Sequence, residues 1–253
     1  MSGTKSPLLW PVVNLLATVV TIIINVIASV LPLHGETTAQ LSDDIPNYFV
    51  PAGWVFSIWG AIYVFMAIFA IYQLMPAHRE DSFIKKVGPL YLISCIANST
   101  WIFVWAWKLI ALSLVVMLVL LISLLGIYLR LQINTETVAR NEWIATRATF
   151  SIYLGWISVA TVANVTALLV VSGVPGLDAA AVTWTVIILV VVMLLGSLMV
   201  FLRKDAVYAL VPLWALAGIL SKQIATPAVA ITAGIGMAVL AFDIIWMLVK
   251  SRK

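Results

Sequence analysis

The chain has 253 residues, of which 64% are hydrophobic and only 9% are charged. A soluble domain of this length would carry far more charged surface, so the composition excludes that class. The net charge of +4 does not indicate nucleic-acid binding, because the basic residues fall in short loops where membrane orientation explains them. Runs of about 20 apolar residues, the length that an α-helix needs to cross a bilayer, recur along the whole sequence. We therefore expect an all-α, polytopic transmembrane helical bundle.

Eight transmembrane spans are predicted in chain order. The first has no small-x-small cleavage site and is too long for the core of a signal peptide, so we expect it to be retained. Cys95 is the only cysteine and falls inside the third span, which excludes an intrachain disulfide. The spans cover approximately residues 10–32, 52–74, 88–107, 110–131, 148–172, 181–202, 206–222 and 227–249.

The basic residues are distributed unevenly between the two sides of the predicted bundle. One side holds only Lys108 and Lys222. Because cytoplasmic loops carry an excess of lysine and arginine, the other side is expected to be cytoplasmic, with both termini, in what we take to be a bacterial cytoplasmic membrane. That side holds Lys5, Arg79, Lys85, Lys86, Arg130, Arg140, Arg147, Arg203, Lys204, Lys250, Arg252 and Lys253.

The first external loop, "HGETTAQLSDDIPNYF", is the longest on its side. It carries Glu36, Asp43 and Asp44 and no basic residue. Loop length alone favours a solvated connector, and the alternative is a lid over a cavity that opens outward. Both interpretations stay open.

Catalytic and metal-binding patterns are missing from the sequence. There is no phosphate-binding GxxxxGK[ST] loop, and we expect no catalytic residues and no covalently bound cofactor. The two histidines, His34 and His78, are expected on opposite sides of the membrane, so no shared metal site is predicted. Asp243 is the only acid well within a span; it is either a functional intramembrane acid or a hydrogen-bonding group inside the bundle, and we prefer the second role.

Polar and aromatic side chains form stripes on four spans when each residue advances by about 100° around a helix. Asparagines in such stripes most simply form hydrogen bonds between helices. Deep tryptophans are not explained by the aromatic belts at the membrane interfaces, and rings beside polar groups would suit a flat, mostly apolar ligand. The stripes are Asn14, Thr18, Thr21 and Asn25; Phe56, Trp59 and Tyr63; Ser94, Asn98, Trp101 and Trp105; and Tyr153, Trp156, Ala160 and Asn164.

A second face of the second span consists of small residues. Gly53, Ser57 and Ala61 lie beside the aromatic stripe of that span, whereas Trp54 points elsewhere. Small residues in membrane helices allow close helix approach, so we expect this face to pack against another helix.

Three segments together resemble the TspO/MBR family of tryptophan-rich sensory and translocator proteins (the peripheral benzodiazepine receptor type). "VPAGWVFSIWGAIYVFMAIFA" is similar to the signature of the second helix of that family, through Pro51, Trp54, Phe56, Trp59 and Tyr63. "ANSTWIFVWAW" resembles its third helix through Asn98 and Trp101. "YLGWISVATVAN" resembles its fifth helix through Tyr153, Trp156, Ala160, Thr161 and Asn164. The resemblance covers approximately residues 10–172.

This resemblance implies a five-helix bundle, often dimeric, with a pocket for tetrapyrroles, sterols or other apolar ligands under the first loop. We expect residues 1–172 to form this bundle and residues 173–253 to add three helices that it lacks. The family's doubled proline motif is reduced here to Val-Pro-Ala-Gly. From the resemblance and from the stripes together, the expected ligand-binding residues are Pro51, Trp54, Phe56, Trp59, Tyr63, Asn98, Trp101, Trp105, Tyr153, Trp156 and Asn164.

Three functions remain open at this point. The leading hypothesis is a binding or sensory protein for a flat apolar ligand, acting without nucleic acid and with a homodimer as one assembly. A small-molecule transporter is the alternative, suggested by the eight spans and Asp243. An enzyme acting on the bound ligand ranks last, because the sequence offers no acid–base pair.

Overall fold

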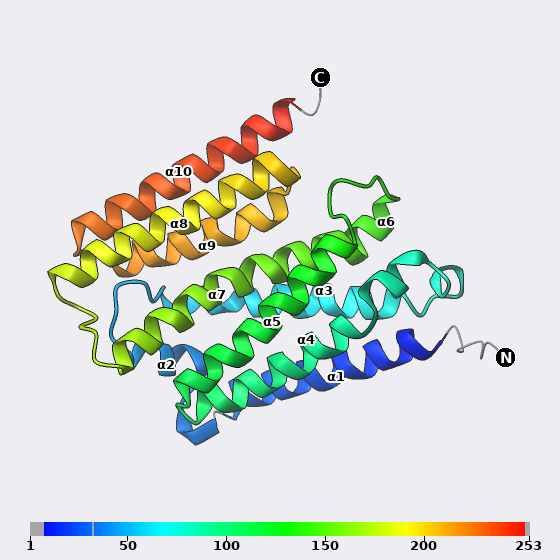
Figure 1. Ribbon diagram of the computed structural model, residues 1–253, viewed down its shortest axis with the longest axis horizontal. Helices are drawn as coiled ribbons and strands as arrows, with labels where there is room; N and C mark the ends of the chain where they lie inside the picture. Colours follow the sequence, from blue (N-terminus) through cyan, green and yellow to red (C-terminus); the bar gives the residue numbers. More distant parts are fainter. Residues whose placement is uncertain (1–7, 32, 251–253) are drawn as a thin grey trace.

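The computed structural model describes residues 8–31 and 33–250, and all of the regular structure in that part of the chain is helical (Figure 1). Most helices cross the length of the bundle, and a few short ones lie in the connections between them. The elements are α1 (Leu9–Val30), η1 (Leu33–Gly35), α2 (Thr38–Asp43), η2 (Gly53–Ser57), α3 (Ile58–Tyr72), η3 (Pro76–His78), α4 (Ser82–Ala106), α5 (Ile110–Arg130), α6 (Arg140–Glu142), η4 (Trp143–Ala148), α7 (Thr149–Val171), α8 (Ala179–Arg203), α9 (Ala206–Lys222) and α10 (Pro227–Lys250).

Among the described residues, seven helical segments are long and apolar enough to cross a membrane, and the protein is an integral membrane protein. The prediction of eight spans is therefore confirmed for seven, and α9 is instead a shorter apolar helix of 17 residues. At about 1.5 Å per residue, α9 is roughly 26 Å long, below the roughly 30 Å of hydrocarbon. Its short length is tolerated because α7, α8 and α10 surround it, so most of α9 contacts protein rather than lipid.

Two of the predicted spans begin differently from expectation. The third, α4, starts at Ser82 and continues across a kink at Gly88, whose φ of 45° lies in the left-handed region and which precedes Pro89. The second span begins as the 3₁₀ helix η2, and α3 continues it from Ile58. The predicted small-residue face does not pack against another helix of this chain, because Gly53, Ser57 and Ala61 are all exposed.

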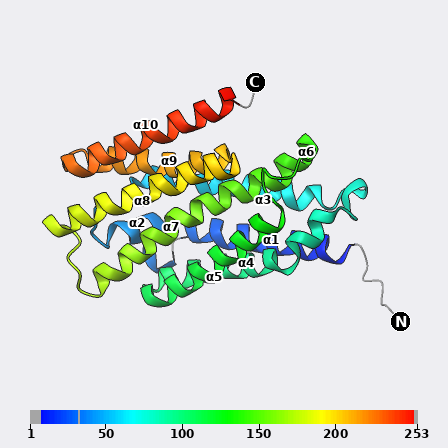
Figure 2. The ribbon, with the colours of Figure 1, turned by 45° about the horizontal axis from the view of Figure 1, so that its top comes forward.

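The helices form two groups that meet along one helix pair. Helices α1, α3, α4, α5 and α7 pack together, and α8, α9 and α10 pack beside them, as two views show (Figures 1 and 2). The main contact between the groups is α7 against α9. Gly155 permits this contact, since a Cβ there would lie 3.0 Å from the Tyr208 carbonyl oxygen and from the Val211 Cβ.

A buried carboxylate ties the same groups together near the start of α9. Asp205 accepts hydrogen bonds from the Tyr128 hydroxyl at 2.8 Å and the Ser151 hydroxyl at 2.6 Å. It also caps α9 by accepting from the Tyr208 backbone N–H at 3.0 Å. One side chain therefore joins α5, α7 and α9, and burial raises its pKa above the ordinary value.

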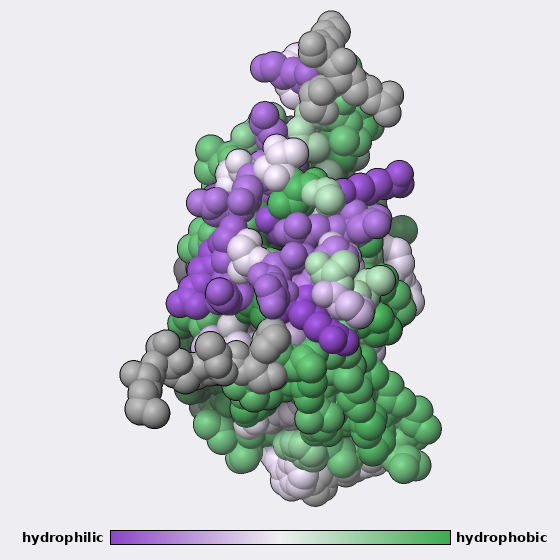
Figure 3. Space-filling model, turned by 90° about the vertical axis from the view of Figure 1, so that its right-hand side faces the viewer, coloured by the Kyte–Doolittle hydropathy of each residue, from purple (hydrophilic) through white to green (hydrophobic). Residues whose placement is uncertain are grey.

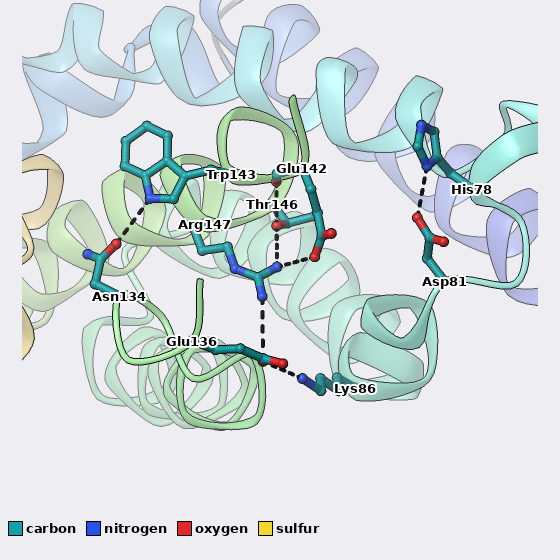
Figure 4. Close-up of polar contacts among 9 residues, drawn as sticks. All are labelled: His78, Asp81, Lys86, Asn134, Glu136, Glu142, Trp143, Thr146 and Arg147. Atoms are coloured by element: carbon teal, nitrogen blue, oxygen red, sulfur yellow. Dashed lines mark hydrogen bonds and ion pairs between the residues drawn. The ribbon is translucent and has the colours of Figure 1, made fainter. Parts of the chain in front are cut away.

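Hydrophilic residues gather on the end of the bundle where α1 begins and α10 ends (Figure 3). We call this the charged end, and the opposite end the lid end. At the charged end Arg147 is buried, and its guanidinium donates to Glu142 at 2.6 Å and lies 3.7 Å from Glu136 (Figure 4). Glu136 also accepts from Lys86 at 2.7 Å, and this contact lowers the pKa of Glu136. The network connects α4 to the π-helical turn η4 that precedes α7.

Candidate functional site

The polar stripes of α1 and α4 face each other inside the bundle. All four residues predicted for the α1 stripe are buried, as are Ser94 and Asn98 on α4. The Asn25 amide donates to Asn98 Oδ1 at 2.7 Å, and the hydroxyls of Thr18 and Tyr91 lie 2.6 Å apart. For this pair of helices, the interpretation of asparagine as a hydrogen-bonding group between helices is confirmed.

A separate cavity lies at the lid end, under the first loop. We call it the ring cavity; its volume is about 40 Å³. Residues of α2, η2, α3, α4, α7 and α9 and of the loop before η2 contribute to its wall. The lining residues are Thr38, Ser42, Phe49, Pro51, Phe56, Trp59, Trp101, Trp105, Trp156, Val159, Ala160, Ala163, Asn164, Ala215 and Ile219.

Two stacked indoles on α4 form one side of the ring cavity. Trp101 and Trp105 lie one helical turn apart, with ring centroids 5.4 Å apart and an interplanar angle of 18°. The Trp101 indole N–H donates to Asn164 Oδ1 at 3.2 Å. The Asn164 amide in turn donates to the Ser113 hydroxyl at 2.9 Å, which fixes Asn164 between α4, α5 and α7.

Three more rings close the opposite side. Phe56 and Trp59 both meet Trp156 edge-on, at centroid distances of 5.9 and 6.2 Å. Trp156 is buried, and its indole N–H has no hydrogen-bond partner among the described residues. A buried donor without a partner is costly, so this N–H is the group of the cavity wall most suited to an acceptor atom on a ligand.

Ion pairs hold the first loop over the ring cavity. Lys108, in the turn between α4 and α5, lies 3.1 Å from Glu36 and 3.3 Å from Asp44. Lys222, at the end of α9, pairs with Asp43. The only two basic residues expected on this side therefore both bind the acidic loop, and the hydrogen bonds from Lys108 raise the pKa of that lysine.

Helix α9 holds the segment that enters α3. The Ala52 backbone N–H donates to the Gly218 carbonyl at 3.2 Å, and the Trp214 indole N–H donates to the Val55 carbonyl at 3.0 Å. Gly218 has no room for a side chain, because a Cβ there would lie 2.0 Å from Val55 Cγ2. A helix beyond the region of family resemblance thus contributes to the cavity wall and also positions η2.

Some residues predicted for the site lie on the cavity wall and others do not. Tyr63 and Tyr153 contact the far side of Trp59, at 5.7 and 6.1 Å, and lie one layer deeper, as does Asn98. Trp54 points out of the bundle, 45% exposed, with its ring edge-on to Trp214 at 4.6 Å. The residues that do line the cavity are Pro51, Phe56, Trp59, Trp101, Trp105, Trp156 and Asn164.

Asp243 lies away from the ring cavity. It is buried on α10 and accepts a hydrogen bond from the Ser197 hydroxyl of α8 at 2.6 Å. This contact fits the hydrogen-bonding role that we preferred for it.

Sequence reasoning missed the small and aliphatic residues of the wall. On α7, Val159 and Ala163 follow Trp156 at helical spacing, so the stripe of that helix could have included them. Ala215 and Ile219 of α9 carry no such signal, since periodicity indicates a buried face but not the helix that covers it. Thr38, Ser42 and Phe49 belong to the loop, whose path the sequence does not fix.

The comparisons with known proteins agree with this architecture. Residues 11–246 match a family described as "TSPO-like protein", so the match extends beyond the five spans of the segment resemblance and includes α8, α9 and most of α10. Searches of curated proteins and of solved structures gave no match. Because the family match spans most of the sequence, the chain belongs to the TSPO-like protein family.

Proposed function

We propose that this protein binds a flat, largely apolar ligand, such as a tetrapyrrole or a sterol, in the ring cavity, and acts as a membrane-embedded binding or sensory protein. Family membership implies a small-molecule binding or sensory role, and tetrapyrroles are ligands of the family. The observation that carries the proposal is the convergence of four tryptophans and a phenylalanine from η2, α3, α4 and α7 on one cavity under the first loop. Aromatic faces stack on planar ligands, and a few polar groups orient them.

The chemistry of the wall fits such a ligand better than its present size does. Asn164 and the open N–H of Trp156 are the polar groups among the rings. A volume of about 40 Å³ holds only a few water molecules, whereas sites for drug-sized ligands span about 300–1,000 Å³. Binding therefore requires rings or loop to move, and the rings are closed on one another in this conformation.

Tryptophan fluorescence tests the proposal directly. The protein in lipid nanodiscs is titrated with protoporphyrin IX, and we expect saturable quenching. Trp101→Phe and Trp156→Phe keep apolar packing but reduce the stacking surface. Each should raise the dissociation constant by about three- to tenfold, which corresponds to the loss of about 0.5–1.5 kcal/mol of ring contact.

The matched control is Trp246→Phe, which removes an exposed indole on α10 that does not line the ring cavity. Its dissociation constant should equal that of the unmodified protein. Quenching that never saturates, or equal dissociation constants for all three variants, would refute binding in the ring cavity.

Transport has less support than binding. The acid that suggested transport, Asp243, is hydrogen-bonded by Ser197 and does not line the ring cavity. The orientation with the charged end in the cytoplasm stays a prediction from the charge distribution, and so does a homodimer.

A further inference from the structure

A second hollow lies directly outside the ring cavity and shares a wall with it. We call it the outer hollow; its volume is about 360 Å³. It lies between α2, the turn from α4 to α5, the start of α5 and the end of α7. Trp105 lines both hollows, so its indole forms part of the partition between them. Helices α2 and α7 are also shared: Thr38 and Ser42 of α2 line the ring cavity and Leu41 lines the outer hollow, while successive turns of α7 line the one and then the other.

We propose that the ligand reaches the ring cavity through the outer hollow, that Trp105 is the gate between them, and that the bound ligand occupies both. This inference rests on the proposed binding function and specifies its access route. It also accounts for the difference in size. The ring cavity alone is too small for the ligand class, while the outer hollow is within the range of about 300–1,000 Å³ that such ligands need.

The side chain of Trp105 is packed in the core with 5% of its surface exposed, but its directional contacts are weak. Its indole N–H donates to the Thr38 carbonyl at 3.4 Å, beyond the usual 2.7–3.2 Å of such bonds. Its ring also stacks on Trp101, a type of contact worth about 0.5–1.5 kcal/mol. Trp101, by contrast, has a shorter hydrogen bond to Asn164 inside the bundle. Of the two stacked indoles, Trp105 therefore has the weaker hydrogen bond, and it is the one that we expect to turn.

The acceptor of Trp105 lies on α2, a helix of six residues that is held by the buried Leu41 and by ion pairs at the surface. The carboxylates of Glu36 and Asp44 on either side of α2 bind Lys108, whose side chain is 57% exposed. Exposed ion pairs contribute about 0–1 kcal/mol and weaken as salt is added. Lys222 also binds α2 through Asp43, so release of the Lys108 latch would loosen α2 and the Thr38 carbonyl rather than detach them, and would make the partition easier to open.

The lining of the outer hollow indicates which end of the ligand remains there. Ile110, Leu168 and Val171 provide an apolar wall, and Asp44, Lys108 and Ser172 provide a polar rim at the lid end. The arrangement fits an amphipathic planar molecule whose apolar part enters the ring cavity and whose hydrogen-bonding edge stays at the rim.

Two other hollows of comparable volume do not offer the same route. One, of about 440 Å³, lies between α1 and α4, and the other, of about 320 Å³, lies between the ends of α7 and α8. Neither shares a lining residue with the ring cavity.

Stopped-flow fluorescence with protoporphyrin IX as the probe, in nanodiscs, tests the route. Ala111→Phe places a ring in the outer hollow from an exposed position and should slow association by about tenfold, a kinetic effect typical of a blocked gate. Thr100→Phe places the same ring in the hollow between α1 and α4 and should leave the association rate unchanged. Trp105→Ala should accelerate association, because the partition is lost.

A variant that keeps the gate but removes its latch gives a second measurement. Lys108 has a φ of 56°, a left-handed conformation that asparagine adopts more readily than most residues, so Lys108→Asn should preserve the turn. It should accelerate association at low salt and reduce the acceleration that salt produces in the unmodified protein, with the Lys222–Asp43 pair accounting for what remains. Association rates that are the same in Ala111→Phe, Lys108→Asn and the unmodified protein would overturn the route while leaving the binding function intact. If the unmodified protein shows no saturable quenching, the binding function fails, and the route fails with it.

Discussion

Arg147 places a cation inside the charged end of the bundle, with only 1% of its surface exposed. Its charge is balanced at short range by Glu142 and at longer range by Glu136, while its Nε has no partner among the described residues. The cost of burying this guanidinium is therefore offset by contacts to its two terminal nitrogens and not to Nε. Such a residue depends on its partners more than an exposed arginine does.

Arg147→Met should lower the free energy of unfolding by about 3–5 kcal/mol, because Glu142 then loses its buried counter-charge. The double variant Arg147→Met with Glu142→Gln should recover part of this loss, since no unpaired charge remains. Thermal unfolding in detergent, followed by circular dichroism, measures both. Lys85→Met, at an exposed position of the same end, is the control and should unfold like the unmodified protein. Equal losses in the single and double variants would contradict the pairing.

At the scale of elements, Gly218 fixes how closely α9 approaches η2. Gly218→Ala should shift η2 outward, because the new Cβ would overlap Val55 Cγ2. We expect a lower unfolding temperature and weaker protoporphyrin binding. Gly234→Ala in α10 is the matched control: nothing lies within 4 Å of a Cβ there, so the better helix propensity of alanine should leave stability equal or slightly higher. Adding Val55→Ala to Gly218→Ala should restore binding, and an absence of rescue would show that the contact does not position η2.

At the same scale, Asp205 should make the stability of the fold depend on pH. Burial raises the pKa of this carboxyl in the folded protein, so folding favours its protonated form. Its contribution to stability is complete below the unfolded pKa of about 3.9 and declines as pH rises through the folded pKa. Asp205→Asn cannot ionise, so the stability of the unmodified protein relative to this variant should fall as pH rises from about 4, and then become constant. Unfolding temperatures measured across that range test this, and a difference that does not vary with pH would contradict it.

The whole molecule is held together across α7 and α9, which makes the connector between α7 and α8 an informative place to divide it. Residues 1–174 and 175–253, expressed together as separate chains, should purify as a complex. Residues 1–174 alone should bind protoporphyrin more weakly than the complex, because Ala215 and Ile219 are missing from the cavity wall. Affinity purification through a tag on the first fragment, followed by titration, measures both. Gly218→Leu in the second fragment should reduce its recovery, since the larger side chain would overlap Val55. If residues 1–174 alone bind like the full chain, the first five spans form an independent domain.

How much of this molecule follows from sequence depends on the scale of the feature. Composition and hydropathy predict the class and most of the spans, because both depend on single stretches of chain. The buried faces of α1 and α4 follow from helical periodicity, as the burial of Asn14 and Asn98 confirms. The exposed Gly53 shows the limit, because periodicity groups residues into faces without indicating which face another helix covers.

The remaining features depend on contacts between segments far apart in the chain. No local pattern indicates that Trp214 binds the carbonyl of Val55, or that Lys222 reaches Asp43. Periodicity identified the buried rings of the ring cavity, but it could not specify which helix faces them. For the same reason, the contribution of α9 could not be predicted.

The single cysteine of the chain has a practical consequence. Cys95 is buried with 2% of its surface exposed, in the middle of a membrane helix, where water-soluble thiol reagents have little access. A cysteine introduced at the exposed Ser172, on the rim of the outer hollow, would therefore be the one readily labelled position. The natural sequence thus already provides a background for site-specific spin or fluorophore labelling, and distances from that label to a second one on α2 would report directly whether the lid moves.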